Sequence, residues 1–241
     1  LTKIMKAKIK DPYLKQGKPY EKFFYETNFI NIFMEINHFL LDLGVKNLDN
    51  KKIIEIGGGP KAHIEFFTKN QIASVESYTI VDDKKYKKNI KILKQKFKNV
   101  KFHYIDFRKQ SKINSSSKFT RLIASHTYEH ISNFEDVFMQ HIKLLKKDAI
   151  ISIALPCDPG FFWSMLQMIA YPIQKIIFGW KSRKEKKLSE ARDHINPIQN
   201  LIKVINYYFE KRKIIYFPFL IPLVDFNFLY VAQLKKKNFN L

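Results

Sequence analysis

Short apolar runs alternate along this chain with longer stretches in which apolar residues recur at helical spacing. Runs dense in apolar residues and bounded by polar or turn residues predict buried strands, and they lie at 52–56, 77–82, 100–106, 119–125 and 149–155. The stretches 62–69, 86–97 and 134–146 carry the helical pattern between them. This alternation predicts an α/β fold with a mainly parallel sheet, covered by helices on both faces.

The two ends of the chain depart from this alternation. Residues 1–20 are basic and read as an arm, and 22–43 have the apolar spacing of an amphipathic helix that ends near Gly44. Residues 156–210 look helical and irregular, and two strand-like runs follow at 213–219 and 226–234. We therefore expect an arm and helix over residues 1–48, and one domain over 49–241 that contains an inserted segment at 156–213.

Composition narrows the classes of function. The formal charge is +21, but almost all basic residues are lysines spread along the chain. Arginine, which makes bidentate phosphate contacts, is scarce, so a dedicated nucleic-acid surface is not favoured. The single cysteine, Cys157, excludes an intramolecular disulfide and a cysteine-based zinc site. It fits a reducing, cytoplasmic setting.

No membrane-crossing segment is predicted. The first ten residues, LTKIMKAKIK, are followed by polar sequence and do not resemble a signal peptide. The most apolar stretch, 161–180, contains Gln167, Pro172 and Lys175 and makes a poor span. We interpret it as a core-facing or lid helix with a break near Pro172. A helix lying on a membrane surface is the alternative, so peripheral membrane contact stays open.

The stretch IIEIGGGP carries the most chemical information. A predicted strand passes through Glu55 and is followed by Gly57, Gly58 and Gly59. Residues without side chains let the backbone turn sharply and approach a ligand closely. In open parallel sheets, ligands bind beyond the carboxyl ends of the strands. No Gly-Lys-Ser/Thr follows, which excludes a P-loop.

The succession IIEIGGGP, YTIVDD, VKFHYID and LIASHTYEHI resembles class I methyltransferases that use S-adenosylmethionine (SAM), of the small-molecule, ubiquinone-methyltransferase-like type. The resemblance covers roughly residues 50–156 and, more loosely, the closing pair of strands. It implies a Rossmann-like doubly wound sheet of about seven strands, mostly parallel with an antiparallel closing strand. It also implies SAM as cofactor, S-adenosylhomocysteine (SAH) as product and a small-molecule acceptor. Lys61 departs from the family, in which a third glycine is usual at this position.

The resemblance assigns a role to each motif. Glu55, Gly57, Gly58 and Gly59 form the cofactor loop. Asp82, with Asp83 sharing or replacing it, would bind the ribose hydroxyls. Asp106 would meet the adenine amino group, and Phe107 would pack on the ring. Ser125 and His126 would line the cofactor and the site of methyl transfer. The insertion at 156–213 would shape the acceptor pocket, with Phe161, Phe162, Trp163 and residues 192–200 as its walls.

Histidines are the candidate bases for an oxygen acceptor. His126 comes first by position and His130 second, while His194 would enter from the insertion. His126, Glu129 and His130 also match H-x-x-E-H, a zinc-protease pattern. That pattern needs a helix, and the residues before His126 predict a strand, so we expect no metal.

Two other functions stay open: an RNA methyltransferase, and a SAM-binding scaffold without activity. Oligomeric state is not predicted.

Overall fold

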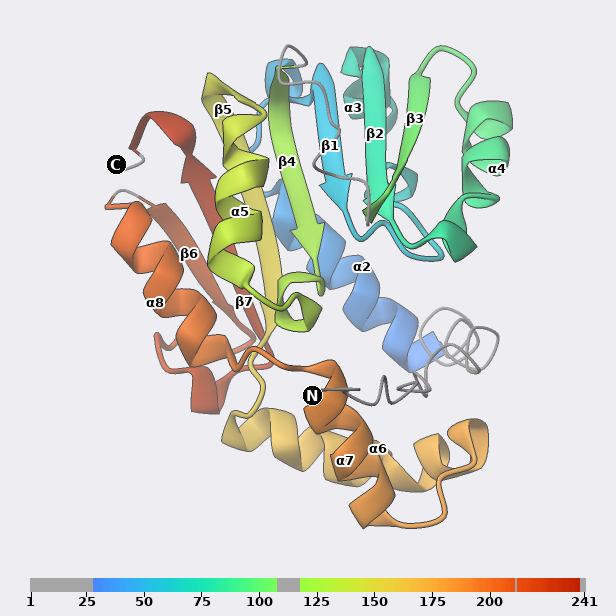
Figure 1. Ribbon diagram of the computed structural model, residues 1–241, viewed down its shortest axis with the longest axis vertical. Helices are drawn as coiled ribbons and strands as arrows, with labels where there is room; N and C mark the ends of the chain where they lie inside the picture. The colour runs from blue at the N-terminus through green and yellow to red at the C-terminus, as the bar shows by residue number, and fades with distance from the viewer. Residues whose placement is uncertain (1–27, 108–117, 211, 239–241) are drawn as a thin grey trace, which may run out of the picture.

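The computed structural model describes residues 28–107, 118–210 and 212–238. Figure 1 shows one sheet with helices on both faces. The strands are β1 (Lys52–Ile56), β2 (Ser77–Asp82), β3 (Lys101–Asp106), β4 (Phe119–Ser125), β5 (Leu145–Pro156), β6 (Arg212–Phe217) and β7 (Leu229–Lys235). The α-helices are α2 (Asn28–Asp42), α3 (Lys69–Ser74), α4 (Asn89–Lys96), α5 (Phe134–Lys143), α6 (Phe161–Phe178), α7 (Arg183–Asp193) and α8 (Ile198–Tyr208). The predicted arm at 1–20 lies outside the described residues.

The sheet has the order β3-β2-β1-β4-β5-β7-β6. Strands β1 to β5 pair in parallel, and β7 is antiparallel to both β5 and β6. The predicted fold class is therefore confirmed. The strand order reverses direction between β1 and β4, so their carboxyl ends flank the place where open sheets bind ligands.

Each face of the sheet carries its own core. Helices α5 and α8 cover one face, with Phe138 and Ile205 completely buried against the central strands. Helices α2 and α4 cover the other face, where Leu41 and Leu93 are buried. Alternate residues of the central strands face opposite cores, which is why these strands are continuously apolar.

The predicted insertion at 156–213 divides into two parts. Helices α6 and α7 lie beyond the carboxyl ends of the parallel strands, whereas α8 runs along the sheet (Figure 1). Helix α6 is continuous through Pro172, so the predicted break is wrong. It is not simply core-facing either, since Ile169, Ile173 and Ile176 are exposed. Among the described residues, no helix is long and apolar enough to cross a membrane.

Two other elements differ from the prediction. The stretch 62–69 forms a short 3-10 helix, η3 (His63–Phe66), and α3 starts after it, where Thr68 and Gln71 make a reciprocal capping box. Strand β5 begins at Leu145, four residues before the apolar run that predicted it. Lys146 to Asp148 are polar and exposed at its start, so the apolar pattern did not include them.

Candidate functional site

The glycine loop and the end of β4 meet at the switch point of the sheet. Gly57 has φ +75°, and a Cβ atom on it would lie 2.2 Å from the Thr127 hydroxyl oxygen. That hydroxyl donates to the Ile56 carbonyl, which ties the two loops together. Gly59 has φ +57° with open space where a Cβ would stand. The loop therefore offers bare backbone to a ligand, as the sequence predicts.

Glu55 supports this loop from inside the sheet. Its carboxylate accepts from the His63 backbone N–H at 3.0 Å and from the Tyr78 hydroxyl at 2.8 Å. Burial raises the pKa of Glu55 to about 7, although these two hydrogen bonds oppose the shift. Glu55 is only 2% exposed, so its position in the structure is that of a loop support.

Asp82 lies beside the loop at the end of β2. It accepts from the backbone N–H groups of Gly59 at 2.5 Å and Asp83 at 2.6 Å. Burial raises its pKa to about 6. Each carboxylate oxygen can accept a second hydrogen bond, so ribose hydroxyls can still be held here. The Asp83 side chain accepts from the Lys85 backbone N–H and caps the next turn.

The remaining cofactor candidates flank these groups. Asp106 is the register partner of Asp82 on β3, so both lie at the same edge of the sheet. Phe107 is half-buried and packs against the core under α5. Lys61, which replaces the usual third glycine, extends over the Phe66 ring, 4.5 Å from its centroid.

The end of β4 carries an unusual backbone conformation. His126 has φ +49°, a strained region for a residue with a side chain. Its N–H donates to the Ala154 carbonyl, and the neighbouring Ser125 hydroxyl accepts from the Asn37 amide at 2.7 Å. Burial lowers the pKa of His126, against the opposing charge of Glu129. Strain of this kind concentrates at functional sites.

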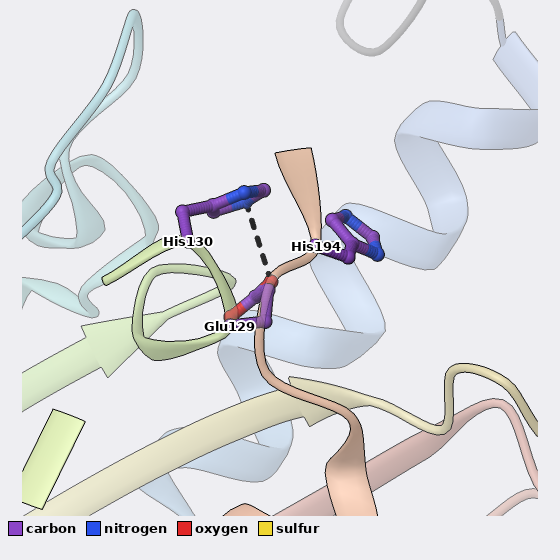
Figure 2. Close-up of side chains that lie close together, drawn as sticks. All are labelled: Glu129, His130 and His194. Atoms are coloured by element: carbon purple, nitrogen blue, oxygen red, sulfur yellow. Dashed lines mark ion pairs between the residues drawn. The ribbon is translucent and has the colours of Figure 1, made fainter. Parts of the chain in front are cut away.

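Glu129, His130 and His194 come together next to His126, and we call them the rim cluster (Figure 2). Glu129 and His130 belong to the 3-10 turn η6 (Tyr128–His130), and His194 follows α7. Asn196 fixes the two segments to each other, because its side-chain amide donates to the Tyr128 and Ile131 carbonyls. The insertion thus brings His194 to the turn after β4.

The pKa of His130 in this cluster is about 9. Burial acts to lower it, and the carboxylates of Glu129 and Asp193 outweigh that effect. His194 lies 2.5 Å from an oxygen of Asp158 through Nδ1. All three predicted catalytic histidines, His126, His130 and His194, therefore lie in one region beyond the sheet.

A second group of polar residues joins α2 to η3 and β4, and we call it the inner cluster: His38, Asp42, His63 and Arg121. His38, His63 and Arg121 are buried, and the Asp42 side chain is 14% exposed. His63 Nε2 lies 2.9 Å from Asp42, which assigns the proton to this nitrogen, because a carboxylate only accepts. Its Nδ1 then accepts from His38 Nδ1 at 2.7 Å. Burial lowers the pKa of both histidines, which are neutral in this arrangement.

Arg121 completes the inner cluster. It is fully buried and contacts Asp42 at 2.9 Å, the Asn50 side chain at 2.8 Å and the Leu41 carbonyl at 2.7 Å. Sequence reasoning missed this cluster and treated Arg121 as an ordinary strand residue. The usable signal was a charged residue inside a run that is otherwise apolar, which requires a buried partner.

One predicted wall of the acceptor pocket has other surroundings than expected. Phe162 packs among Phe219, Phe226 and Phe228 and does not form an open wall, while Phe161 is 65% exposed. Cys157 is buried and its pKa is raised to about 12, mainly by burial, which does not suit a nucleophile.

A wide depression in the described part of the chain lies far from these groups. It has a volume of about 910 Å³ and is open to solvent at the opposite end of the sheet, where β4 and β5 begin. Its lining includes Lys118, Lys146, Lys147, Lys236 and Lys237. The residue chemistry described above, and not the size of this depression, locates the candidate site.

Comparison with known proteins identifies the family and the fold of the chain. A family model described as a methyltransferase domain matches residues 30–201. No curated protein matches the chain. The plantazolicin methyltransferase BpumL, solved with SAH, superposes with a TM-score of 0.55 at 14% identity, covering 92% of this chain and 96% of BpumL.

Two further structures show the same fold. The CurJ carbon methyltransferase superposes with a TM-score of 0.61 at 12% identity, over 93% of this chain and 61% of its own. Phosphoethanolamine N-methyltransferase 2 of Haemonchus contortus, solved with SAM, gives 0.53 at 14% identity, over 88% of this chain and 44% of its own. At such identities the likeness concerns the fold.

Proposed function

The chain belongs to the methyltransferase domain family, and from that premise we propose that it transfers a methyl group from SAM to an oxygen or nitrogen atom of a small-molecule, sugar or lipid-linked acceptor. The observation that carries the proposal is the open glycine loop, with Asp82 on one side and the strained end of β4 on the other. The methyl group of SAM is attached to a positively charged sulfur, which makes it reactive toward nucleophiles.

The residues of the loop fit this cofactor. The open space at Gly59 admits a ligand against the backbone, and Asp82 can accept hydrogen bonds from two neighbouring hydroxyls. Asp106, at the same edge, is the proposed partner of the adenine amino group, beside Phe107. Ser125 and His126, at the end of β4, are the proposed lining of the place where transfer would occur. The main contribution of the protein is to align the acceptor with the methyl group and exclude water.

His126 is the proposed base for an oxygen acceptor. It would take the hydroxyl proton as the oxygen attacks the methyl carbon and the carbon–sulfur bond breaks toward sulfur. General-base catalysis contributes roughly 100-fold or more, so His126→Ala should lower kcat by about that factor with SAM binding retained. An unchanged kcat would remove His126 from the mechanism.

Titration calorimetry with SAM and SAH tests the proposal. Wild-type protein should bind both, and Gly57→Ala should lose binding because its Cβ would collide with Thr127. Gly179→Ala is the matched control, since Gly179 also has a positive φ but open space around it. Absence of SAM and SAH binding by the wild-type protein would overturn the proposal.

The acceptor class needs a second measurement. Isotope-labelled SAM, incubated with the protein and either a small-metabolite extract or RNA, should label the small molecules. The lysine-lined depression lies at the opposite end of the sheet and does not serve the proposed site. Labelled RNA would replace the small-molecule assignment. SAM binding without transfer to any fraction would support the scaffold alternative.

A further inference from the structure

The rim cluster contains a buried carboxylate that accepts no hydrogen bond from the part of the chain that the structure describes. The Glu129 side chain is 3% exposed, and neither of its oxygens has a hydrogen-bond donor among the described residues. The histidine nitrogens beside it are His130 Nε2 at 3.6 Å and His126 Nδ1 at 3.8 Å, both beyond hydrogen-bond distance. Burying a carboxylate in this way costs free energy unless a cation compensates it.

Both histidines of the rim cluster are held through the same ring nitrogen. His194 Nδ1 contacts the Asp158 carboxylate at 2.5 Å. His130 Nδ1 contacts the Asp193 carbonyl oxygen at 3.0 Å and its carboxylate at 3.3 Å. In metal sites a ligating histidine donates its second N–H to a carboxylate or carbonyl, which fixes the ring and leaves the other nitrogen for the ion. Here Nε2 of each ring is left for that role.

We propose that Glu129, His130 and His194 bind a divalent transition-metal ion, with Zn²⁺ as the first choice. One ligand atom from each residue lies within 4.8 Å of the other two. In a tetrahedral zinc site these atoms stand roughly 3.3 Å apart, so small side-chain rotations would complete the geometry. Two histidines and one carboxylate form the ligand set of catalytic zinc sites, which keep one position open.

This site differs from the H-x-x-E-H pattern in the sequence. His126 lies at the end of a strand with φ +49°, so the helix that the pattern requires is absent here. His194 from the insertion takes the place of that histidine (Figure 2). The insertion would then supply a ligand as well as a wall, and metal binding would fix it to the sheet.

The open position would face the acceptor. His130 and His194 side chains are 34% and 22% exposed, in contrast to Glu129, so the cluster opens toward solvent on the histidine side. An ion there would act as a Lewis acid on oxygen groups. This extension rests on the proposed methyl transfer and narrows the acceptor to molecules with hydroxyl or carboxylate oxygens.

Zinc titration of chelator-treated, full-length protein tests the site. Wild-type protein should bind one Zn²⁺ per chain. His194→Ala and Glu129→Gln should weaken the binding by more than Asp158→Asn, for which the weakened contact with His194 Nδ1 predicts a loss of about 10- to 100-fold. His103→Ala removes an exposed histidine on β3 and should have no effect. Co²⁺ bound to the wild-type protein should give the visible absorption spectrum of a cobalt ion with few ligands. The His194→Ala and Glu129→Gln variants should not give this spectrum.

The outcomes separate this inference from the proposed function. Absence of stoichiometric zinc, or equal zinc binding by all variants, would overturn the metal site and leave Glu129 and His130 as an ion pair. SAM binding, measured on the same zinc-free samples, reports on the cofactor loop alone. Zinc binding without SAM binding would overturn the proposed function instead. Circular dichroism of each variant confirms that it is folded.

Discussion

The inner cluster and the rim cluster are both groups of histidines and acidic residues, but they differ in how their polar atoms are paired. In the inner cluster, Arg121 and Asp42 are in direct contact, and the Arg121 guanidinium also meets a carbonyl, an amide oxygen and a hydroxyl. In the rim cluster, Glu129 accepts no hydrogen bond from any described residue, and both histidine rings reach solvent. A paired buried network supports the fold, whereas an unpaired one has capacity for a ligand.

The largest effect on stability is expected from Arg121→Met. The variant leaves the largely buried Asp42 charged without its arginine partner, and removing one partner of a buried ion pair costs about 3–5 kcal/mol. Urea unfolding measures the loss. Arg183→Met, at an exposed position of α7, should cost less than about 1 kcal/mol. A small loss for Arg121→Met would mean that the inner cluster does not hold the fold together.

The next effect is a pH dependence at Glu55, which is joined to the inner cluster through the His63 N–H. Its pKa rises from 4.5 to about 7 on folding, so the folded state binds more protons between these values. The wild-type protein should therefore lose stability relative to Glu55→Gln as pH rises from 4.5 to 7, by on the order of 3 kcal/mol. Paired unfolding curves across this range measure the difference, and exposed Glu76→Gln is the control. A difference that does not change with pH would contradict the prediction.

Much of the fold and part of the site are readable from the sequence. The runs 52–56, 77–82 and 119–125 match β1, β2 and β4 residue for residue, because strands buried on both faces are continuously apolar. Strand ends in a parallel sheet share one edge, so the sequence could group Glu55, Asp82 and Asp106 at that edge.

The pairings across the insertion were not predictable. His194 meets His130 only because Asn196 fixes the segment after α7 to the turn after β4. Arg121 and Asp42 come from a strand and a helix whose packing no local pattern specifies. Such contacts depend on tertiary structure, and a single sequence carries little signal for them.

A smaller effect is expected from His38→Phe in the inner cluster. His38 stacks on Phe66 with ring centroids 3.8 Å apart, and phenylalanine retains that contact. The His63 Nδ1 atom would lose its donor, which costs roughly 1–3 kcal/mol when the group stays buried. Thermal unfolding measures it, with His103→Phe as the exposed control. Unchanged stability would show that the His38–His63 hydrogen bond contributes nothing.

The smallest effect on stability is expected from Glu129→Gln in the rim cluster. The substitution keeps the size of the side chain and breaks no hydrogen bond among the described residues. It removes one charge of an ion pair with His130, which is 3.6 Å away and 34% exposed, so in the presence of a chelator the free energy of unfolding should change by less than about 1 kcal/mol. Added zinc should separate the two proteins. A ligand at 100 times its Kd stabilises the folded state by about 2.7 kcal/mol, and only the wild-type protein should gain it. If Glu129→Gln instead loses as much stability as Arg121→Met without zinc, Glu129 belongs with the structural residues and the contrast between the two clusters disappears.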